Sequence, residues 1–290
     1  MFKGCLVAIV TPFENGKLDE KRFKDLIEFQ IKNGTSGIVP CGTTGESATL
    51  SLEEHERVVQ LTVQAAGGRV PVIAGTGSNN TAEAIELTRH AKQVGADGAL
   101  LISPYYNKPT QEGVYLHFKA IAKEVDIPIV LYNIASRTGI NLQPQTIARL
   151  AQIKNIVAVK EASGNVSQMA QVINACEGKL ELISGDDALT LPVLSIGGVG
   201  VISVVANIVP GQTAQMVKLF VEGKLEQARE IYYQLLPLIK AMFIETNPIP
   251  VKTAMGMMGL IKPDLRLPLC PLQPENQEEL KTVLKQYKLI

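Results

Sequence analysis

Short continuous apolar runs recur along the chain, and each is followed by a turn and an amphipathic segment. Valine, isoleucine and leucine follow one another in these runs without polar alternation, as in parallel strands that are covered on both faces. The runs lie at residues 5–10, 37–40, 70–74, 99–102, 127–132, 156–160, 180–184 and 199–205. The pattern therefore predicts eight parallel strands connected by helices.

Helical periodicity fills the segments between these runs, and start signals mark where the helices begin. Ser51 and Glu54 have the spacing of a capping box, and Asn80 and Glu83 repeat that spacing. Eight successive βα units fit an α/β fold of the (β/α)8 TIM barrel type, whereas a doubly wound sheet more often has about five or six strands.

The barrel pattern is complete by Gly223, and a purely helical pattern follows it. Its three segments lie at residues 225–245, 250–258 and 274–288. We therefore divide the chain into a catalytic barrel, residues 1–223, and a C-terminal helical domain, residues 224–290. The second part is at the size limit for independent folding, so we expect it to pack on the barrel.

Charge and cysteine content narrow the class of protein. The 28 basic residues balance the 28 acidic ones and are scattered singly, which argues against a nucleic-acid surface. The four cysteines lie far apart without a CxxC pair, as expected for reduced thiols in a cytoplasmic protein. Residues 188–217 carry no charge, but prolines and glycines divide them into pieces too short to span a membrane. The three histidines form no His-x-His pair, so neither a metal nor a cofactor is expected.

Lys160 is the most informative residue at the predicted strand ends. Side-chain alternation places Ala158 and Lys160 on the same face of their strand. If that face points into the barrel, apolar walls disfavour the charged ammonium, and a neutral lysine forms Schiff bases with carbonyl compounds. The alternative interpretation is a strand-end lysine that extends into solvent or pairs with an acid.

Tyr132 ends the strand before that of Lys160, so the two residues should be neighbours. A tyrosine hydroxyl can relay protons when it meets another hydroxyl, and Thr43 at the end of the second strand is a candidate partner. The alternative is a core tyrosine with one satisfied hydrogen bond.

Glycine-rich segments at residues 42–45 and 75–77 lie at the same rim, where TIM-barrel enzymes hold their active sites. Their spacing does not match a dinucleotide-binding fingerprint. They either offer backbone N–H groups to a small carboxylate or form tight turns. Asp186 and Asp187 are expected to cap the helix that follows them.

These segments together resemble the dihydrodipicolinate synthase family, which belongs to the Schiff-base-forming, pyruvate-dependent lyases. The resemblance runs from Gly4 to the C-terminal helices. It is carried by AIVTP at 8–12, GTTGES at 42–47, PVIAGTG at 71–77, PYYN at 104–107, YN at 132–133, SRTG at 136–139, VKEA at 159–162, GDD at 185–187 and NPIPVK at 247–252. Each motif alone is weak, but the combination is highly specific.

The resemblance implies a reaction. Lys160 would condense with pyruvate, and the resulting enamine would attack L-aspartate 4-semialdehyde to give 4-hydroxy-tetrahydrodipicolinate, in lysine biosynthesis. Thr43, Tyr132 and Tyr106 would form the proton relay. Tyr106 would come from a neighbouring subunit of a homotetramer built as a dimer of dimers.

The same resemblance implies which residues bind the substrates. Thr44 would bind the pyruvate carboxylate, and backbone carbonyls of Gly185 and Ile202 would line the pocket. Arg137 would bind the carboxylate of the semialdehyde through a bidentate contact. Ala135 stands where the family usually has proline, and this loss is expected to loosen the loop that carries Arg137.

Feedback inhibition by L-lysine at the dimer interface is also implied by the resemblance. The matching ligand positions are Ser47, Ala48, His55, Asn79, Glu83 and Tyr105. Two of them have other interpretations, because Glu83 could complete a capping box with Asn80 and His55 could be one polar residue among several on its helix.

Two rival functions are left open. N-acetylneuraminate lyase and sugar-acid aldolases share the lysine and tyrosine chemistry, but they generally lack an arginine at the position of Arg137. A catalytically silent regulatory barrel is the rival from another class, and the intact set of Lys160, Tyr132, Thr43 and Arg137 argues against it.

Overall fold

The computed structural model describes residues 1–290, and eight parallel strands form its centre. The barrel strands are β1 (Gly4–Ala8), β4 (Gly37–Val39), β5 (Ile73–Gly75), β6 (Gly98–Ile102), β7 (Ile129–Asn133), β8 (Ile156–Glu161), β9 (Glu181–Ser184) and β10 (Gly200–Ser203). They pair in the order β4-β1-β10-β9-β8-β7-β6-β5, and a parallel bridge from Ile38 to Val72 joins the two ends of this order. The predicted TIM barrel is confirmed.

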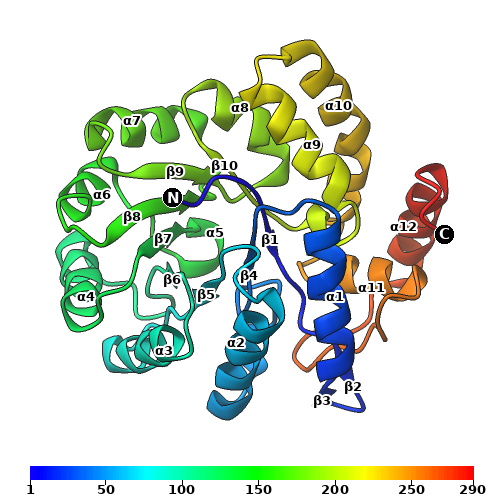
Figure 1. Cartoon of the computed structure of the whole chain (residues 1–290), viewed down its shortest axis with the longest axis horizontal. Coiled ribbons are helices and arrows are strands. Elements are labelled where there is room, and N and C mark those ends of the chain that lie inside the picture. Colours follow the sequence, from blue (N-terminus) through cyan, green and yellow to red (C-terminus); the bar gives the residue numbers. More distant parts are fainter.

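Helices surround the barrel, as Figure 1 shows. They are α1 (Glu20–Lys32), α2 (Leu52–Ala66), α3 (Thr81–Gln93), α4 (Gln111–Glu124), α5 (Ala135–Thr138), α6 (Pro144–Leu150), α7 (Val166–Cys176), α8 (Thr190–Ser195) and α9 (Pro210–Val221). A small hairpin, β2 (Phe13–Glu14) with β3 (Lys17–Leu18), follows β1. No helix of the structure combines the length and the apolar character needed to cross a membrane.

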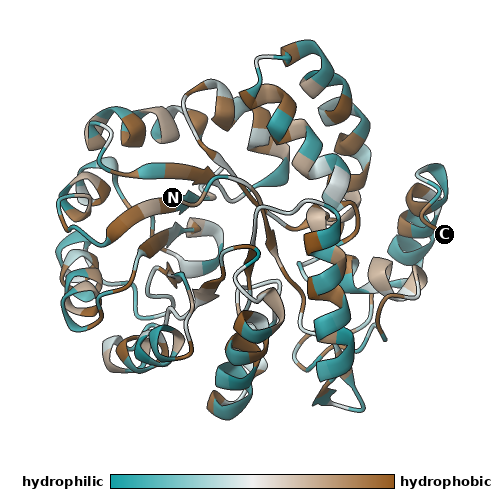
Figure 2. Ribbon diagram, in the orientation of Figure 1, coloured by the Kyte–Doolittle hydropathy of each residue, from teal (hydrophilic) through white to brown (hydrophobic).

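The apolar side chains form separate layers inside and outside the strands. Leu6, Val130, Ala158 and Ile202 belong to a buried cluster in the barrel interior, and Phe2 belongs to the same cluster. The outward side chains of the strands pack against the inner faces of the helices, which are brown in Figure 2, while the outer helix faces are teal. This two-sided burial explains why the strands read as continuous apolar runs.

Several predicted strand boundaries are wrong by one to three residues. The run at 70–74 forms a regular strand only from Ile73, and the run at 199–205 ends as a strand at Ser203. At the second position, the Asp187 carboxylate accepts hydrogen bonds from the backbone N–H groups of Val204 (2.9 Å) and Val205 (3.1 Å). These two N–H groups therefore bond to a side chain, and the chain turns into a short helix at Val205–Asn207.

The helix start signals are partly confirmed. Ser51 and Glu54 form the predicted capping box of α2. Asn80 caps α3, but Glu83 does not complete a capping box, because its carboxylate accepts a hydrogen bond from the Ser78 hydroxyl. The capping-box interpretation of Glu83 is wrong.

Asp186 and Asp187 have different roles. The Asp186 side chain accepts a hydrogen bond from Ala188 N (2.9 Å) and caps the short helix Asp187–Leu189, as predicted. The prediction is wrong for Asp187, whose carboxylate bonds to the turn after β10. Burial raises the pKa of Asp187.

The C-terminal segment packs beside α1 and α9 at one side of the barrel (Figure 1). Its helices are α10 (Leu225–Ala241), α11 (Ile249–Met257) and α12 (Pro274–Gln286). Leu235, Leu280 and Leu284 belong to the same buried cluster as Val7 and Ile27 of the barrel. The core is therefore continuous across Gly223, and the division of the chain into two domains at that residue stays a prediction.

Candidate active site

Lys160 lies beside Tyr132 at the mouth of the barrel. The two residues are register partners on the neighbouring strands β8 and β7, and their exposed fractions are 6% and 5%. The Lys160 Nζ is 4.1 Å from the centroid of the Tyr132 ring. A buried lysine next to a phenol can supply an amine nucleophile and a proton donor at one place.

A register irregularity brings this pair together. Ile129 is paired with Ile156, but Val130 is paired with Ala158, so the sheet shifts by one residue between them. Val157 is the extra residue, and it packs toward the barrel interior with Ala158. Without this bulge Tyr132 would face Val159 instead of Lys160.

Gly185 and Ile202, which the resemblance assigns to the pyruvate pocket, come from the neighbouring strands β9 and β10: Gly185 directly follows β9, and Ile202 lies on β10. A Cβ atom added to Gly185 would come within 3.1 Å of both Cγ and Cε of Lys160, so the bare backbone packs against the lysine stem. Ile202 is buried on β10 in the cluster that fills the barrel interior. Gly185 therefore borders the Lys160 side chain.

Asn247 links two predicted substrate-binding residues, and the sequence prediction gave it no role. Its side-chain Nδ2 donates to Thr44 Oγ1 (3.0 Å), and its backbone oxygen accepts from Arg137 Nη2 (2.9 Å). Asn247 Oδ1 is buried without a partner. The motif at 247–252 was the only sequence signal for this residue.

A cavity of about 440 Å³ opens next to these residues. Thr43, Arg137 and Asn247 line it, together with five of the six predicted lysine-binding residues, Ser47, Ala48, His55, Glu83 and Tyr105. The sixth, Asn79, donates from Nδ2 to the backbone oxygen of Tyr105 (3.0 Å). The fold thus gathers these residues from five separate segments around one cavity. Its wall does not include Lys160, Tyr132, Tyr106, Thr44, Gly185 or Ile202.

His55 has a ring nitrogen that can accept a hydrogen bond from the ammonium group of a ligand. Its Nε2 lies 2.7 Å from the Gly75 carbonyl oxygen, and its Nδ1 is buried without a partner. Burial lowers the pKa of His55, which favours the neutral ring. Since a carbonyl oxygen only accepts, Nε2 carries the proton, and the Nδ1 lone pair is free to accept a hydrogen bond.

The three side chains of the implied relay are not connected within one chain. No hydrogen bond joins Thr43, Tyr132 and Tyr106, and the side-chain hydrogen bond that reaches Tyr132 comes from Ser103 Oγ to its backbone oxygen (3.1 Å). Tyr106 is 89% exposed and has a backbone φ of 72°, in the left-handed region. A tyrosine this exposed contributes to a buried site only if another surface covers it.

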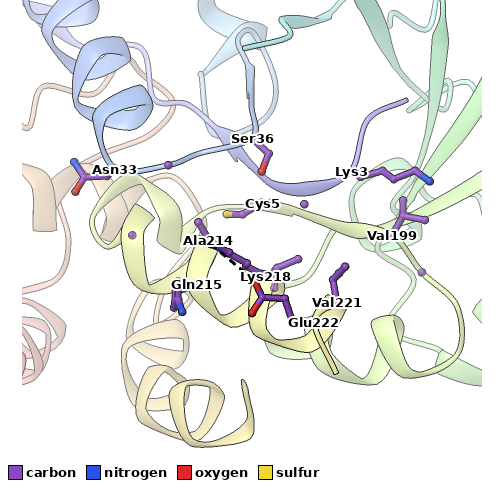
Figure 3. Close-up of a pocket in the computed structure, with 15 residues that line it drawn as sticks. Lys3, Cys5, Asn33, Ser36, Val199, Ala214, Gln215, Lys218, Val221 and Glu222 are labelled. Carbon is purple, nitrogen blue, oxygen red and sulfur yellow. Dashed lines mark ion pairs between the residues drawn. The ribbon is translucent and has the colours of Figure 1, made fainter. Parts of the chain in front are cut away.

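A larger cavity of about 800 Å³ lies elsewhere, at the start of β1 and β10 beside α9 (Figure 3). Lys3, Cys5, Gln215 and Lys218 are among its lining residues, and none of the predicted site residues is. It is at the amino ends of the strands, whereas TIM-barrel active sites lie at the carboxyl ends. The candidate active site is therefore the smaller cavity and the adjacent barrel mouth.

The site offers no obvious place for a metal ion. Nowhere in the chain do three or more His, Cys, Asp or Glu side chains come close enough together to hold one. A TIM barrel with a buried lysine beside a tyrosine at its mouth is typical of the lyases that bind their substrate as a lysine Schiff base.

Comparison with known proteins agrees with this class. The sequence profile of the Dihydrodipicolinate synthetase family matches residues 1–287, and the chain belongs to this family. It is 60% identical over 291 residues to the 4-hydroxy-tetrahydrodipicolinate synthase of Syntrophobacter fumaroxidans, and the match covers 100% of both chains.

Solved structures agree as well. The dihydrodipicolinate synthase of Acinetobacter baumannii, complexed with pyruvate, has a TM-score of 0.98 and 46% identity, and the match covers 100% of both chains. The enzyme of Cyanidioschyzon merolae with lysine bound has a TM-score of 0.96 and 41% identity, and the match covers 100% of this chain and 99% of that one. The family resemblance seen in the sequence is confirmed.

Proposed function

We propose that this protein condenses pyruvate with L-aspartate 4-semialdehyde to 4-hydroxy-tetrahydrodipicolinate, as a lyase of the class I aldolase type in lysine biosynthesis. The observation that carries the proposal is the buried Lys160 beside Tyr132, next to a cavity that holds Thr43 and Arg137. Its close relatives bear the name of this synthase, and one solved relative contains pyruvate.

The first half of the reaction takes place at Lys160. Its amine attacks the keto carbon of pyruvate, and water leaves as the imine forms. Thr44 holds the pyruvate carboxylate, and Gly185 leaves room for the imine beside the lysine stem. Loss of a proton from the methyl group gives the enamine, with Tyr132 and Thr43 handling the proton.

The second half joins the two substrates. The enamine carbon attacks the aldehyde carbon of the semialdehyde, whose carboxylate is bound by Arg137, and Tyr132 protonates the new alkoxide. The amino group of the former semialdehyde then attacks the imine carbon, closes the ring and releases Lys160. Carbon, nitrogen and proton balance require no cofactor.

Borohydride trapping tests the nucleophile. Treatment with pyruvate and borohydride should add a three-carbon group to the peptide that contains Lys160 and should inactivate the enzyme, while Lys160→Arg should give no adduct. Mass spectrometry reads both outcomes. An adduct on a different lysine, or none in the wild type, would overturn the assignment.

The aldehyde substrate separates the synthase from its rivals. Arg137 is held toward the cavity by the backbone oxygen of Asn247, and a guanidinium there suits a carboxylate better than a long polyhydroxylated chain. We expect product from pyruvate with aspartate semialdehyde and none with N-acetylmannosamine. The reverse preference would indicate a neuraminate lyase, and no product with either would indicate a silent barrel.

L-lysine is the proposed inhibitor, bound among Ser47, Ala48, His55, Asn79, Glu83 and Tyr105. Glu83 supplies a carboxylate and His55 Nδ1 a free acceptor for the two ammonium groups of lysine. Glu83→Gln should raise the half-inhibitory lysine concentration about tenfold, because a charge-assisted contact is lost. Full wild-type activity in tens of millimolar lysine would refute the proposed inhibition.

We also propose that the protein is a homotetramer and that it is cytoplasmic.

A further inference from the structure

Glu46 and Lys252 form an ion pair that is fully inside the protein. Both side chains have an exposed fraction of 0%, and Lys252 Nζ is 2.5 Å from Glu46 Oε1. Glu46 directly follows the loop that carries Thr43 and Thr44, whereas Lys252 belongs to α11 in the C-terminal segment. The pair therefore joins the candidate active site to a part of the chain about 200 residues away.

Both partners of the pair make a further hydrogen bond to the backbone of a neighbouring segment. Lys252 Nζ also donates to the backbone oxygen of Thr11 (3.0 Å), and Thr11 Oγ1 donates to the backbone oxygen of Gly45 (2.7 Å). Glu46 Oε2 accepts from the backbone N–H of Arg266 (3.1 Å). Lys252 and Arg266, both in the C-terminal segment, thus bind the two oxygens of the Glu46 carboxylate at the end of the loop.

The backbone at Glu46 needs such support. Its φ of 51° lies in the left-handed region, which a residue with a long side chain rarely adopts. This conformation turns the chain two residues after Thr44, and Glu46 N donates to Thr43 O (3.1 Å) within the turn. The ion pair compensates the strained backbone at the position that directs the two threonines.

Stability alone does not account for the pair. Desolvation of two charges offsets much of their attraction, and apolar replacements of buried pairs are often as stable or more stable. Burial lowers the pKa of Lys252, which is the same desolvation cost. A buried pair that adds little stability can still hold one geometry.

We propose that Glu46 and Lys252 are positioning residues that hold the Thr43–Thr44 loop in its pyruvate-binding geometry. This inference rests on the proposed function of Lys160 and Thr44. The C-terminal segment is then part of the active-site framework, and loss of the pair weakens pyruvate binding even where the fold survives.

A charge-free double variant separates positioning from stability. Glu46→Gln and Lys252→Met alone each leave one charge buried, so both should lower the melting temperature. Glu46→Gln/Lys252→Met should melt near the wild type. In the double variant, the pyruvate concentration that gives half-maximal borohydride trapping at Lys160 should still be about tenfold higher than in the wild type, since small misplacements in a site are costly.

The steady-state constants give a second readout. The KM for pyruvate should rise in the double variant more than the KM for the semialdehyde, because Asn247 and not this pair holds Arg137. Lys262→Met is the matched control. It breaks the exposed ion pair between Lys262 and Glu14, and this pair also joins the C-terminal segment to the N-terminal hairpin. The control variant should leave borohydride trapping unchanged.

Wild-type melting together with wild-type trapping in the double variant would overturn the proposal, and the pair would then be structural only. Should the double variant not fold, Glu46→Asp decides, because it keeps the charge and tolerates a positive φ but withdraws the carboxylate from Lys252. Wild-type trapping by Glu46→Asp would also overturn the proposal. Absence of any pyruvate adduct in the wild type would count against the proposed function instead.

Discussion

At the scale of single residues, Gly185 is where one added carbon should affect the chemistry most directly. An alanine Cβ there would meet Lys160 Cε and Cγ at 3.1 Å and Ala162 Cβ at 2.8 Å. We expect Gly185→Ala to displace the Lys160 stem and to lower kcat/KM at least about tenfold, as misplaced reacting groups do. Steady-state kinetics and the rate of borohydride trapping check this.

Gly211→Ala provides the comparison for Gly185→Ala. Gly211 is on α9, and its added Cβ would meet Asn33 only at 3.7 Å, an ordinary contact distance. This variant should keep full activity and gain up to about 1 kcal/mol of stability from helix propensity. Equal activity of the two variants would show that Lys160 tolerates the extra carbon.

At the scale of elements, the short helix α5 decides how Arg137 is held. Ala135 is its first residue, a position that favours proline, and Ile134 before it has φ −145° and ψ 81°, outside the α-helical region that a following proline disfavours. Ala135→Pro should therefore fit, and it should stabilise the protein by roughly 0.4–1 kcal/mol. Thermal unfolding and the KM for the semialdehyde measure the effect.

A contact with the C-terminal segment opposes the loosening expected for the Arg137 loop. Arg137 Nη2 donates to the backbone oxygen of Asn247, so its guanidinium is held from the C-terminal segment as well. We therefore expect Ala135→Pro to change the KM for the semialdehyde less than twofold, roughly 0.4 kcal/mol. A large decrease in that KM would mean that the missing proline does weaken substrate binding.

The contact between α3 and α4 should make stability depend on pH through His117. Its Nδ1 is 2.9 Å from Thr81 Oγ1, its Nε2 is buried without a partner, and burial lowers its pKa from 6.5 to about 4. Between these two values the unfolded chain binds a proton that the folded chain does not. Stability is therefore full above pH 6.5 and falls as the pH decreases toward 4, by about 3 kcal/mol in total.

Urea unfolding at several pH values, with His117→Gln as the comparison, checks this dependence. Glutamine carries no charge at any of these pH values, so the variant should lose less stability than the wild type between pH 6.5 and 4. Identical pH profiles for both proteins would assign the acid sensitivity to other groups.

At the scale of the whole molecule, the exposed Tyr106 points to assembly. Its side chain is 89% exposed in the single chain, although the proposed relay needs it next to Thr43 and Tyr132. Two-fold symmetry would let each subunit complete its partner's site. Tyr106→Phe and Lys160→Ala subunits should each be inactive alone. After mixing and subunit exchange, half of the dimers contain one subunit of each kind, and one of the two sites in such a dimer is intact. The mixture should therefore regain about a quarter of wild-type activity.

Mixing each variant with wild-type subunits controls for the exchange itself. If exchange is shown by mass spectrometry and activity stays absent, Tyr106 acts within its own chain or not at all. Complementation would support the shared site and, with it, the assembly included in the proposed function.

The local pattern of the chain was enough to predict the architecture. Two-sided burial of a strand gives a continuous apolar run, and a capping box such as Ser51 with Glu54 is formed by residues three apart, so both signals are readable in sequence. Lys160 and Tyr132 were found because each ends such a run. Asn247, Lys252 and Ser78 received no role, because their partners lie elsewhere in the chain or across a turn.

The sequence by itself thus determined the eight strands, the starts of α2 and α3 and the identity of the lysine at the barrel mouth, since short-range periodicity and spacing encode them. Only the tertiary structure decided that a bulge at Val157 sets Lys160 opposite Tyr132, because register depends on how two strands pack over a shared core. It also decided that the C-terminal segment holds the Thr43–Thr44 loop through Lys252. That contact joins residues about 200 positions apart, and no local pattern encodes it, because the tertiary structure alone brings the two charges together and buries them.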